Sequence, residues 1–167
     1  MPHPTLGLPP DDATAGLPRA ADTLRRERLR LARLALEAAL RIAPDFRDRY
    51  EEIDLRQFLR DYEQHVEQLA RAMETGNDSF VTMYAEWLVP VYRRREVPIK
   101  DQGVLLLGLR DAVATVLAPE DGRVANDYLY RWRARLARHG ALPGDHKGNG
   151  IVRFFWKGAG LGDRGTV

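Results

Sequence analysis

Apolar residues recur every three or four positions along most of the chain, which is the spacing of helices with one buried face. The clearest run follows Asp54 and contains Leu55, Phe58, Tyr62, Val66, Leu69 and Met73. Gly76 stands just after this run, where glycine commonly ends a helix because it adopts the left-handed backbone conformation without strain. The pattern therefore predicts a long helix over residues 54–75.

Four further helices are predicted from the same periodicity and from the proline, glycine and capping residues between the apolar runs. They cover about residues 22–42, 79–96, 100–117 and 121–139. Pro90 lies inside the second of these and is expected to kink or split it, because proline has no backbone N–H to donate. The helix over residues 100–117 is apolar on more than one side, which is typical of a helix at the centre of a bundle.

The two ends of the chain differ in composition from the helical body. We predict a proline-rich arm over residues 1–21, a helical domain over 22–139 and a glycine-rich tail over 140–167. The tail contains an apolar cluster made of Ile151, Val152, Phe154, Phe155 and Trp156. Such a cluster is expected to be buried, either on its own bundle or on a partner protein. No strand pattern alternates with the helices, so the predicted fold class is all-α with about five helices.

Composition narrows the classes of function. The 26 basic and 24 acidic residues leave a formal net charge of +2, which gives no general attraction to nucleic acids or membranes. The absence of cysteine excludes disulfides, thiolate metal sites and a thiol nucleophile. No apolar run approaches the roughly 18 residues of a membrane-spanning helix, and the N-terminus lacks the pattern of a secretory signal. We therefore expect a cytoplasmic protein.

Residues that could carry catalysis are scarce. The chain has four histidines, none paired at metal-ligand spacing, and its single serine, Ser79, has no histidine placed to activate it. The sequence thus predicts neither an enzyme nor a metal site. In the helix over residues 54–75, however, Asp61 and His65 are four residues apart and should be neighbours beside the apolar stripe. They can bind pyrrole N–H groups, ligate haem iron through His65, or form a simple surface pair.

The region from Leu59 to Leu136 resembles the C-terminal half of phycobiliproteins, the globin-like proteins of phycobilisomes. The elements that carry the resemblance, in chain order, are Arg60-Asp61, the turn Ala72–Gly76, Tyr92 followed by Val97-Pro98, Ala114–Leu117 and Asn126–Tyr128. The stretch over residues 75–98 is also similar to helical sensor modules found beside regulatory domains in bacteria. Both resemblances imply a bacterial, globin-like or bundle-type binding module with no enzymatic activity.

The resemblance also implies a ligand. In phycobiliproteins a cysteine three residues before the aspartate holds a linear tetrapyrrole, and the Arg-Asp pair contacts its propionate and ring nitrogens. Phe58 stands at the cysteine position here, so covalent attachment of a bilin is impossible. Non-covalent binding of a linear tetrapyrrole or haem is the remaining expectation. The residues expected around it are Phe58, Arg60, Asp61, Tyr62, His65, Tyr84 and Trp87.

Three functions remain open from the sequence. The first is a ligand-sensing or ligand-carrying module. The second is an assembly or scaffold subunit, in a homo-oligomer or a larger complex, whose tail docks on partners through Ile151, Phe154, Phe155 and Trp156. The third and weakest is nucleic-acid binding by the arginines along residues 131–138, which the nearly balanced charge argues against.

Overall fold

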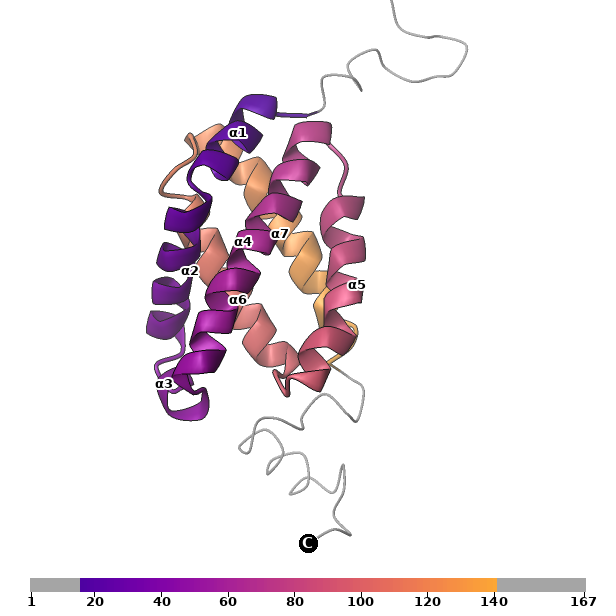
Figure 1. Cartoon of the computed structure of the whole chain (residues 1–167). Helices are drawn as coiled ribbons and strands as arrows, with labels where there is room; N and C mark the ends of the chain where they lie inside the picture. The colour runs from indigo at the N-terminus through magenta and orange to yellow at the C-terminus, as the bar shows by residue number, and fades with distance from the viewer. Residues whose placement is uncertain (1–15, 141–167) are drawn as a thin grey trace, which may run out of the picture.

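The computed structural model describes residues 16–140, and every element of regular structure in this range is a helix. The predicted all-α class is therefore confirmed (Figure 1). The helices are α1 (Pro18–Arg26), α2 (Arg28–Ile42), α3 (Phe46–Arg49), α4 (Glu52–Thr75), α5 (Ser79–Arg94), α6 (Ile99–Val113) and α7 (Pro119–Ala137). Residues 1–15 and the tail from residue 141, with its apolar cluster, lie outside the described range.

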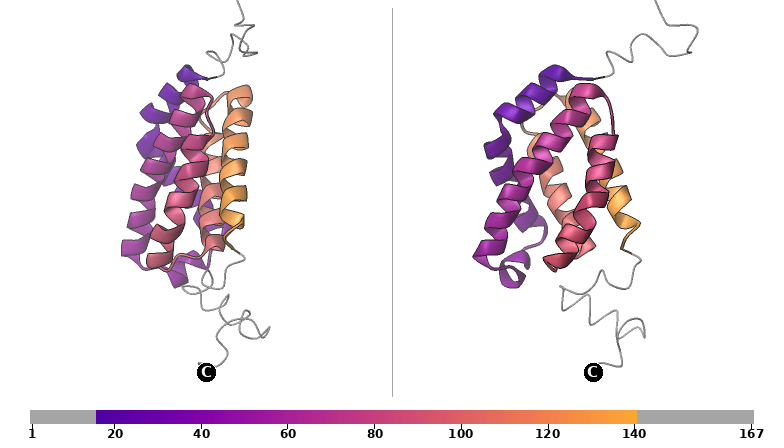
Figure 2. Two further views of the ribbon diagram at one scale, coloured as in Figure 1. Left: turned by 90° about the vertical axis from the view of Figure 1, so that its right-hand side faces the viewer. Right: turned by 45° about the vertical axis from the view of Figure 1, so that its right-hand side comes forward.

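The long helices lie side by side in a bundle (Figures 1 and 2). α4 packs against α1, α2 and α5, while α6 packs between α2 and α7. Leu105 and Leu109 of α6 are buried, as expected for a central helix. The α2–α6 contact is especially close at Gly108, because a Cβ atom there would lie 2.4 Å from the carbonyl oxygen of Ala35. None of the helices in the described range is long and apolar enough to span a membrane.

The structure has seven helices in the described range rather than the predicted five or so. The single helix predicted over residues 22–42 is two helices, broken at Glu27, and it begins four residues earlier at Pro18. Proline is favoured in the first turn of a helix, where its missing N–H is not needed. The break at Glu27 lets α1 lie on α4, where Arg25 pairs with Glu74 at 3.0 Å, while α2 packs on α6. The short helix α3 was not predicted.

Two other boundaries differ from the prediction. α5 is continuous through Pro90, which lies on its exposed side, so the predicted split of this helix is wrong. α6 ends at Val113 instead of continuing to residue 117. The C-terminal end of α4 is as predicted, since Gly76 caps it with a φ of 68° in the left-handed region.

Candidate functional site

Five polar side chains form a hydrogen-bonded chain between α4 and α5, which we call the α4–α5 chain. It consists of Asp61 and His65 from α4, Tyr84 and Tyr92 from α5, and Arg95 at the C-cap of α5. Because the two helices run in opposite directions, Tyr84 meets His65, and Tyr92, about two turns further along α5, contacts both His65 and Asp61. His65 and Tyr92 are almost completely buried. Polar groups buried to this degree require partners, and the chain supplies them.

The hydrogen bonds of the α4–α5 chain fit one arrangement of protons. The hydroxyl of Tyr92 donates to Asp61 Oδ2 at 3.0 Å, so its oxygen is free to accept from Nε2–H of His65 at 3.1 Å. The other ring nitrogen, Nδ1, then accepts from the hydroxyl of Tyr84 at 3.2 Å. This assigns His65 as the neutral Nε2–H tautomer. Burial lowers the pKa of His65 to about 4, although the nearby carboxylate of Asp61 opposes part of this shift.

The charged end of the α4–α5 chain reaches the surface. Arg95 Nη1 donates to Asp61 Oδ2 at 2.7 Å, and the exposed fractions of these side chains are 27% and 16%. The guanidinium carbon of Arg95 also lies 4.9 Å from the ring centre of Tyr92 and 5.7 Å from that of Phe58. The chain therefore has an ion pair at its solvent-exposed end and a neutral imidazole in the core.

The structure separates the residues that the sequence grouped as ligand contacts. Asp61, His65 and Tyr84 do come together, but Tyr62 faces the bundle interior and donates to the carbonyl of Leu105 at 2.7 Å. Phe58 is buried against the ring of Tyr50, with their centres 5.0 Å apart.

The remaining two predicted contacts lie at the surface. Arg60 is exposed and bonds only to its helical neighbour Gln57, as far as the described residues show. Trp87 is 60% exposed, with its ring stacked on Tyr84. Sequence reasoning missed Tyr92 and Arg95 as partners of Asp61, because they lie 31 and 34 residues away.

The α4–α5 chain has little capacity to bind a ligand, because its polar atoms already bond to one another. Both ring nitrogens of His65 are engaged, so ligation of haem iron would first require one of these bonds to break. Within residues 16–140 no three His, Asp or Glu side chains are grouped so as to hold a metal ion. One buried donor beside the chain, Nε1 of Trp132, has no hydrogen-bond partner in the described structure. The arrangement is that of a structural proton-sharing network rather than an open ligand site.

A second buried polar group, the α3–α6 cluster, consists of Arg49, Tyr50 and Asp101. Arg49 binds the carboxylate of Asp101 through both terminal nitrogens, at 2.6 and 3.1 Å, and the hydroxyl of Tyr50 donates to the same carboxylate. Asp101 is 1% exposed. Burial, together with the Asp101 carboxylate, raises the pKa of Tyr50 far above its ordinary value, so this hydroxyl stays a donor.

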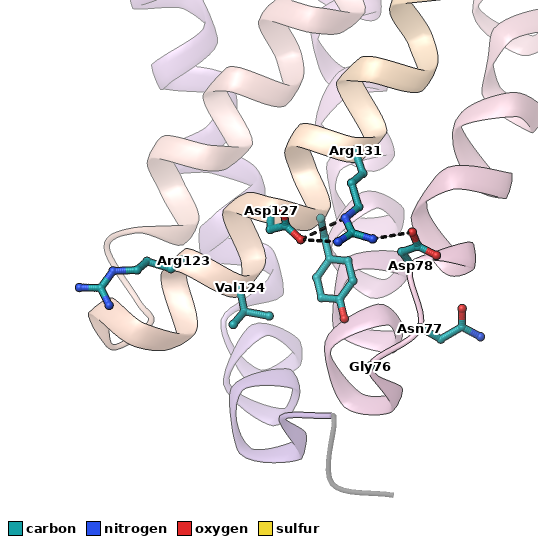
Figure 3. Close-up of a pocket in the computed structure, with 8 residues that line it drawn as sticks. Gly76, Asn77, Asp78, Arg123, Val124, Asp127 and Arg131 are labelled. Carbon is teal, nitrogen blue, oxygen red and sulfur yellow. Dashed lines mark hydrogen bonds and ion pairs between the residues drawn. The ribbon is translucent and has the colours of Figure 1, made fainter. Parts of the chain in front are cut away.

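Two of the arginines considered for nucleic-acid binding, Arg131 and Arg135, are paired with acids. One end of α7 and the α4–α5 turn border a hollow of about 480 Å³ (Figure 3). Arg131 bridges it, donating to Asp78 at 2.9 Å and to Asp127 at 3.0 Å. Arg135 lies 3.4 Å from Glu86. Carboxylates at these distances offset the positive charge that phosphate groups would need.

The outer side of α5 carries an exposed surface, the α5 ridge, made of the apolar residues Met83, Trp87 and Pro90 followed by Arg94. These residues are spaced by four, three and four positions and therefore lie along one line of the helix. Met83 is 70% exposed and Trp87 60%. Beside the ridge, a second hollow of about 480 Å³ separates α5 from α7, with Thr82 on one side and Tyr130 on the other. Tyr130 is itself 67% exposed.

Comparison of the chain with protein-family models, curated proteins and solved structures gives no significant match. The resemblance to phycobiliproteins, and the tetrapyrrole that it implies, therefore stay predictions.

Proposed function

We propose that this chain is a non-enzymatic assembly module, in which two copies associate through their α5 ridges. The single observation that carries the proposal is the exposure of Met83 and Trp87 side by side on one helix. Burying a methionine side chain contributes about 1.5–3 kcal/mol, and tryptophan is among the residues most enriched at interface hot spots. While the ridge faces water, neither side chain contributes this burial free energy.

The ridge is supported from beneath, which favours binding. The rings of Trp87 and Tyr84 are stacked at 17° with their centres 5.7 Å apart. Tyr84 is in turn fixed by its hydrogen bond to His65 and by edge contact with Trp132, at 5.3 Å between ring centres. A tryptophan held in one orientation loses little conformational entropy on association. The α4–α5 chain therefore serves, in this proposal, to hold the ridge in a binding-ready form.

A second copy is a suitable occupant because the ridge is complementary to itself. In a dimer whose two-fold axis is perpendicular to α5, the same patch contacts itself with the helices antiparallel. This packing would place Arg94 of one copy near the start of α5 in the other, close to the carboxylate of Asp78, which also binds Arg131 of its own chain. Apolar contacts would fill the centre, and opposite charges would face each other at the ends.

Sedimentation velocity over a range of concentrations tests the proposal. We expect the wild-type chain to show a monomer–dimer equilibrium that the double substitution Met83→Ser, Trp87→Ser weakens by at least about tenfold, since a loss of about 1.4 kcal/mol already has that effect. The matched control is Leu29→Ser, Ile53→Ser, which removes two other exposed apolar side chains, 57% and 67% exposed, on α2 and α4. Association that is absent in the wild type, or equal in both variants, would reject this function.

A further inference from the structure

We infer that the apolar segment Ile151–Trp156 of the same chain is an intramolecular occupant of the α5 ridge and competes there with the second copy. The competition rests on the proposed function, whereas the docking of the segment does not. Ile151, Val152, Phe154, Phe155 and Trp156 place five apolar side chains, three of them aromatic, within six residues. The ridge offers the matching exposed apolar surface in the described part of the chain.

The described chain ends near the C-terminal end of α5. α5 and α7 run in the same direction, because Asp78 pairs with Arg131 near the start of α5 and Glu86 pairs with His139 further along (Figure 2). His139 Nε2 lies 2.6 Å from Glu86 Oε2, and Glu86 immediately precedes Trp87. The described chain therefore ends on the α5 side of the bundle, where Gly140 lies beside Ile99 at the start of α6.

The intervening chain is long enough to reach every part of the ridge. Residues 141–150 are ten residues, which extend to at most about 33–36 Å. A coil of the same length has an average span of about 16–19 Å. α5, with 16 residues, is about 24 Å long, and the described chain ends at Gly140 beside Ile99, five residues beyond the last residue of α5. Neither end of the ridge is out of reach.

The surface next to the ridge can accept side chains of the segment. The hollow between α5 and α7 begins at Thr82, the residue before Met83, and is lined by Thr82, Tyr130 and Ala134 together with the charged residues Asp78, Arg131, Arg135 and Arg138. Tyr130 and Ala134 offer apolar contacts, while Arg138 can lie over an aromatic ring. An aromatic side chain in this hollow and another on Trp87 would bury both surfaces together. The ridge and the hollow thus form one acceptor for a short aromatic segment.

Connection through the same chain gives the segment an advantage over a second copy. A short linker produces an effective concentration of about a millimolar, which exceeds a micromolar concentration of free protein by about a thousandfold. The segment is therefore expected to occupy the ridge at low protein concentration and to yield to a second copy as the concentration rises. In this way the tail would set the threshold for assembly.

Disulfide trapping in the full chain tests the docking, because the natural sequence contains no cysteine. Met83→Cys combined with Val152→Cys places one thiol on the ridge and one in the segment. Leu29→Cys combined with Val152→Cys is the control, since α2 and α5 lie on opposite sides of the bundle (Figure 1). We expect the intramolecular disulfide, measured by intact mass and by mobility on non-reducing gels, to form at least about tenfold faster in the ridge pair. Equal rates, or a disulfide formed only between molecules, would overturn the inference.

Sedimentation of Phe154→Ser, Phe155→Ser then separates this inference from the proposed function. The expected result is tighter self-association, by about tenfold, because the competitor has been removed. If the two cysteine pairs form disulfides at equal rates but dimerisation still depends on Met83 and Trp87, docking of the segment is rejected and the assembly proposal is retained. If the ridge pair forms the intramolecular disulfide faster but substitution of Met83 and Trp87 does not change self-association, the proposed dimer is rejected and docking of the segment is retained.

Discussion

The α4–α5 chain and the α3–α6 cluster are built from the same three groups, an aspartate, an arginine and a tyrosine, but they place their charges differently. In the α3–α6 cluster Asp101 is 1% exposed and is bound by Arg49 through two hydrogen bonds. It also lies in the first turn of α6, where the helix dipole favours a negative charge. In the α4–α5 chain the Asp61 side chain is 16% exposed and lies in mid-helix.

The difference shows how a bundle can use the same chemistry for two purposes. The α3–α6 cluster ties the loop before α4 to the start of α6, and its only further ion pair among the described residues joins Arg49 to Asp45 in the same loop, so its role is to fix the fold. The α4–α5 chain instead continues through His65 to Tyr84, whose ring supports the exposed Trp87. The buried imidazole of His65 is therefore linked, through Tyr84, to the surface that we propose as the interface.

The largest expected effect is the loss of the Asp101 carboxylate. Asp101→Ala leaves Arg49 and Tyr50 without their shared acceptor, and removing one partner of a buried ion pair costs about 3–5 kcal/mol. Asp61→Ala should cost less, about 1–3 kcal/mol, because Arg95 is 27% exposed and can regain water. Urea unfolding of both variants measures the two losses. Equal losses would mean that the two aspartates are equally important to the fold.

The next effect is a pH dependence that His65 gives to the α4–α5 chain. The pKa of His65 is about 4 in the folded protein, below the ordinary value of about 6.5. Between these values the unfolded chain binds the proton and the folded chain does not, so stability falls as the pH decreases through this window. The expected loss between pH 7 and pH 5 is about 2 kcal/mol.

His65→Gln supplies the control for that prediction, since glutamine keeps a donor and an acceptor but does not titrate. Asp61 and Arg95 face the imidazole in both proteins, so their contribution is retained in the comparison. Urea unfolding at both pH values should show that the substitution removes most of the dependence. An unchanged dependence in the variant would assign it to other groups.

The long helices were predictable because their signals are local. The apolar stripe of α4 repeats over several turns, and Gly76 ends the helix as expected. The break at Glu27 was not predictable, because apolar spacing continues through it and the break depends on α1 packing against α4. The same limit applies to the site. That Asp61 and His65 are neighbours follows from helical spacing, whereas the approach of Tyr92 and Arg95 is decided by how α5 packs.

The pair Arg60-Asp61 illustrates what spacing along the chain cannot tell. Adjacent residues on a helix point about 100° apart, so the two members of this pair need not share a ligand. Arg60 is exposed, and Asp61 turns toward α5. A motif read as one unit from the sequence is divided between solvent and a buried network.

The smallest expected effect comes from Tyr84→Phe, which keeps the ring under Trp87 and removes only the hydroxyl that donates to Nδ1 of His65. Leaving one neutral acceptor without a partner costs about 1–3 kcal/mol when it is fully buried, and the half-buried position of Tyr84 places the effect near the lower end.

The sharper measurement is the ¹⁵N spectrum of the His65 side chain. In the wild type the proton should be on Nε2, and in Tyr84→Phe it should stay there while the Nδ1 signal moves toward that of an unbonded nitrogen. A proton found on Nδ1 in the wild type would reverse the direction of the whole chain, because Tyr84 would then accept and Tyr92 could not donate to both His65 and Asp61. Dimerisation should weaken only slightly in this variant, because the stacked ring and its edge contact with Trp132 remain while the hydrogen bond to His65 is lost. A loss of dimerisation would show that the hydroxyl, rather than the ring, holds Trp87 in place.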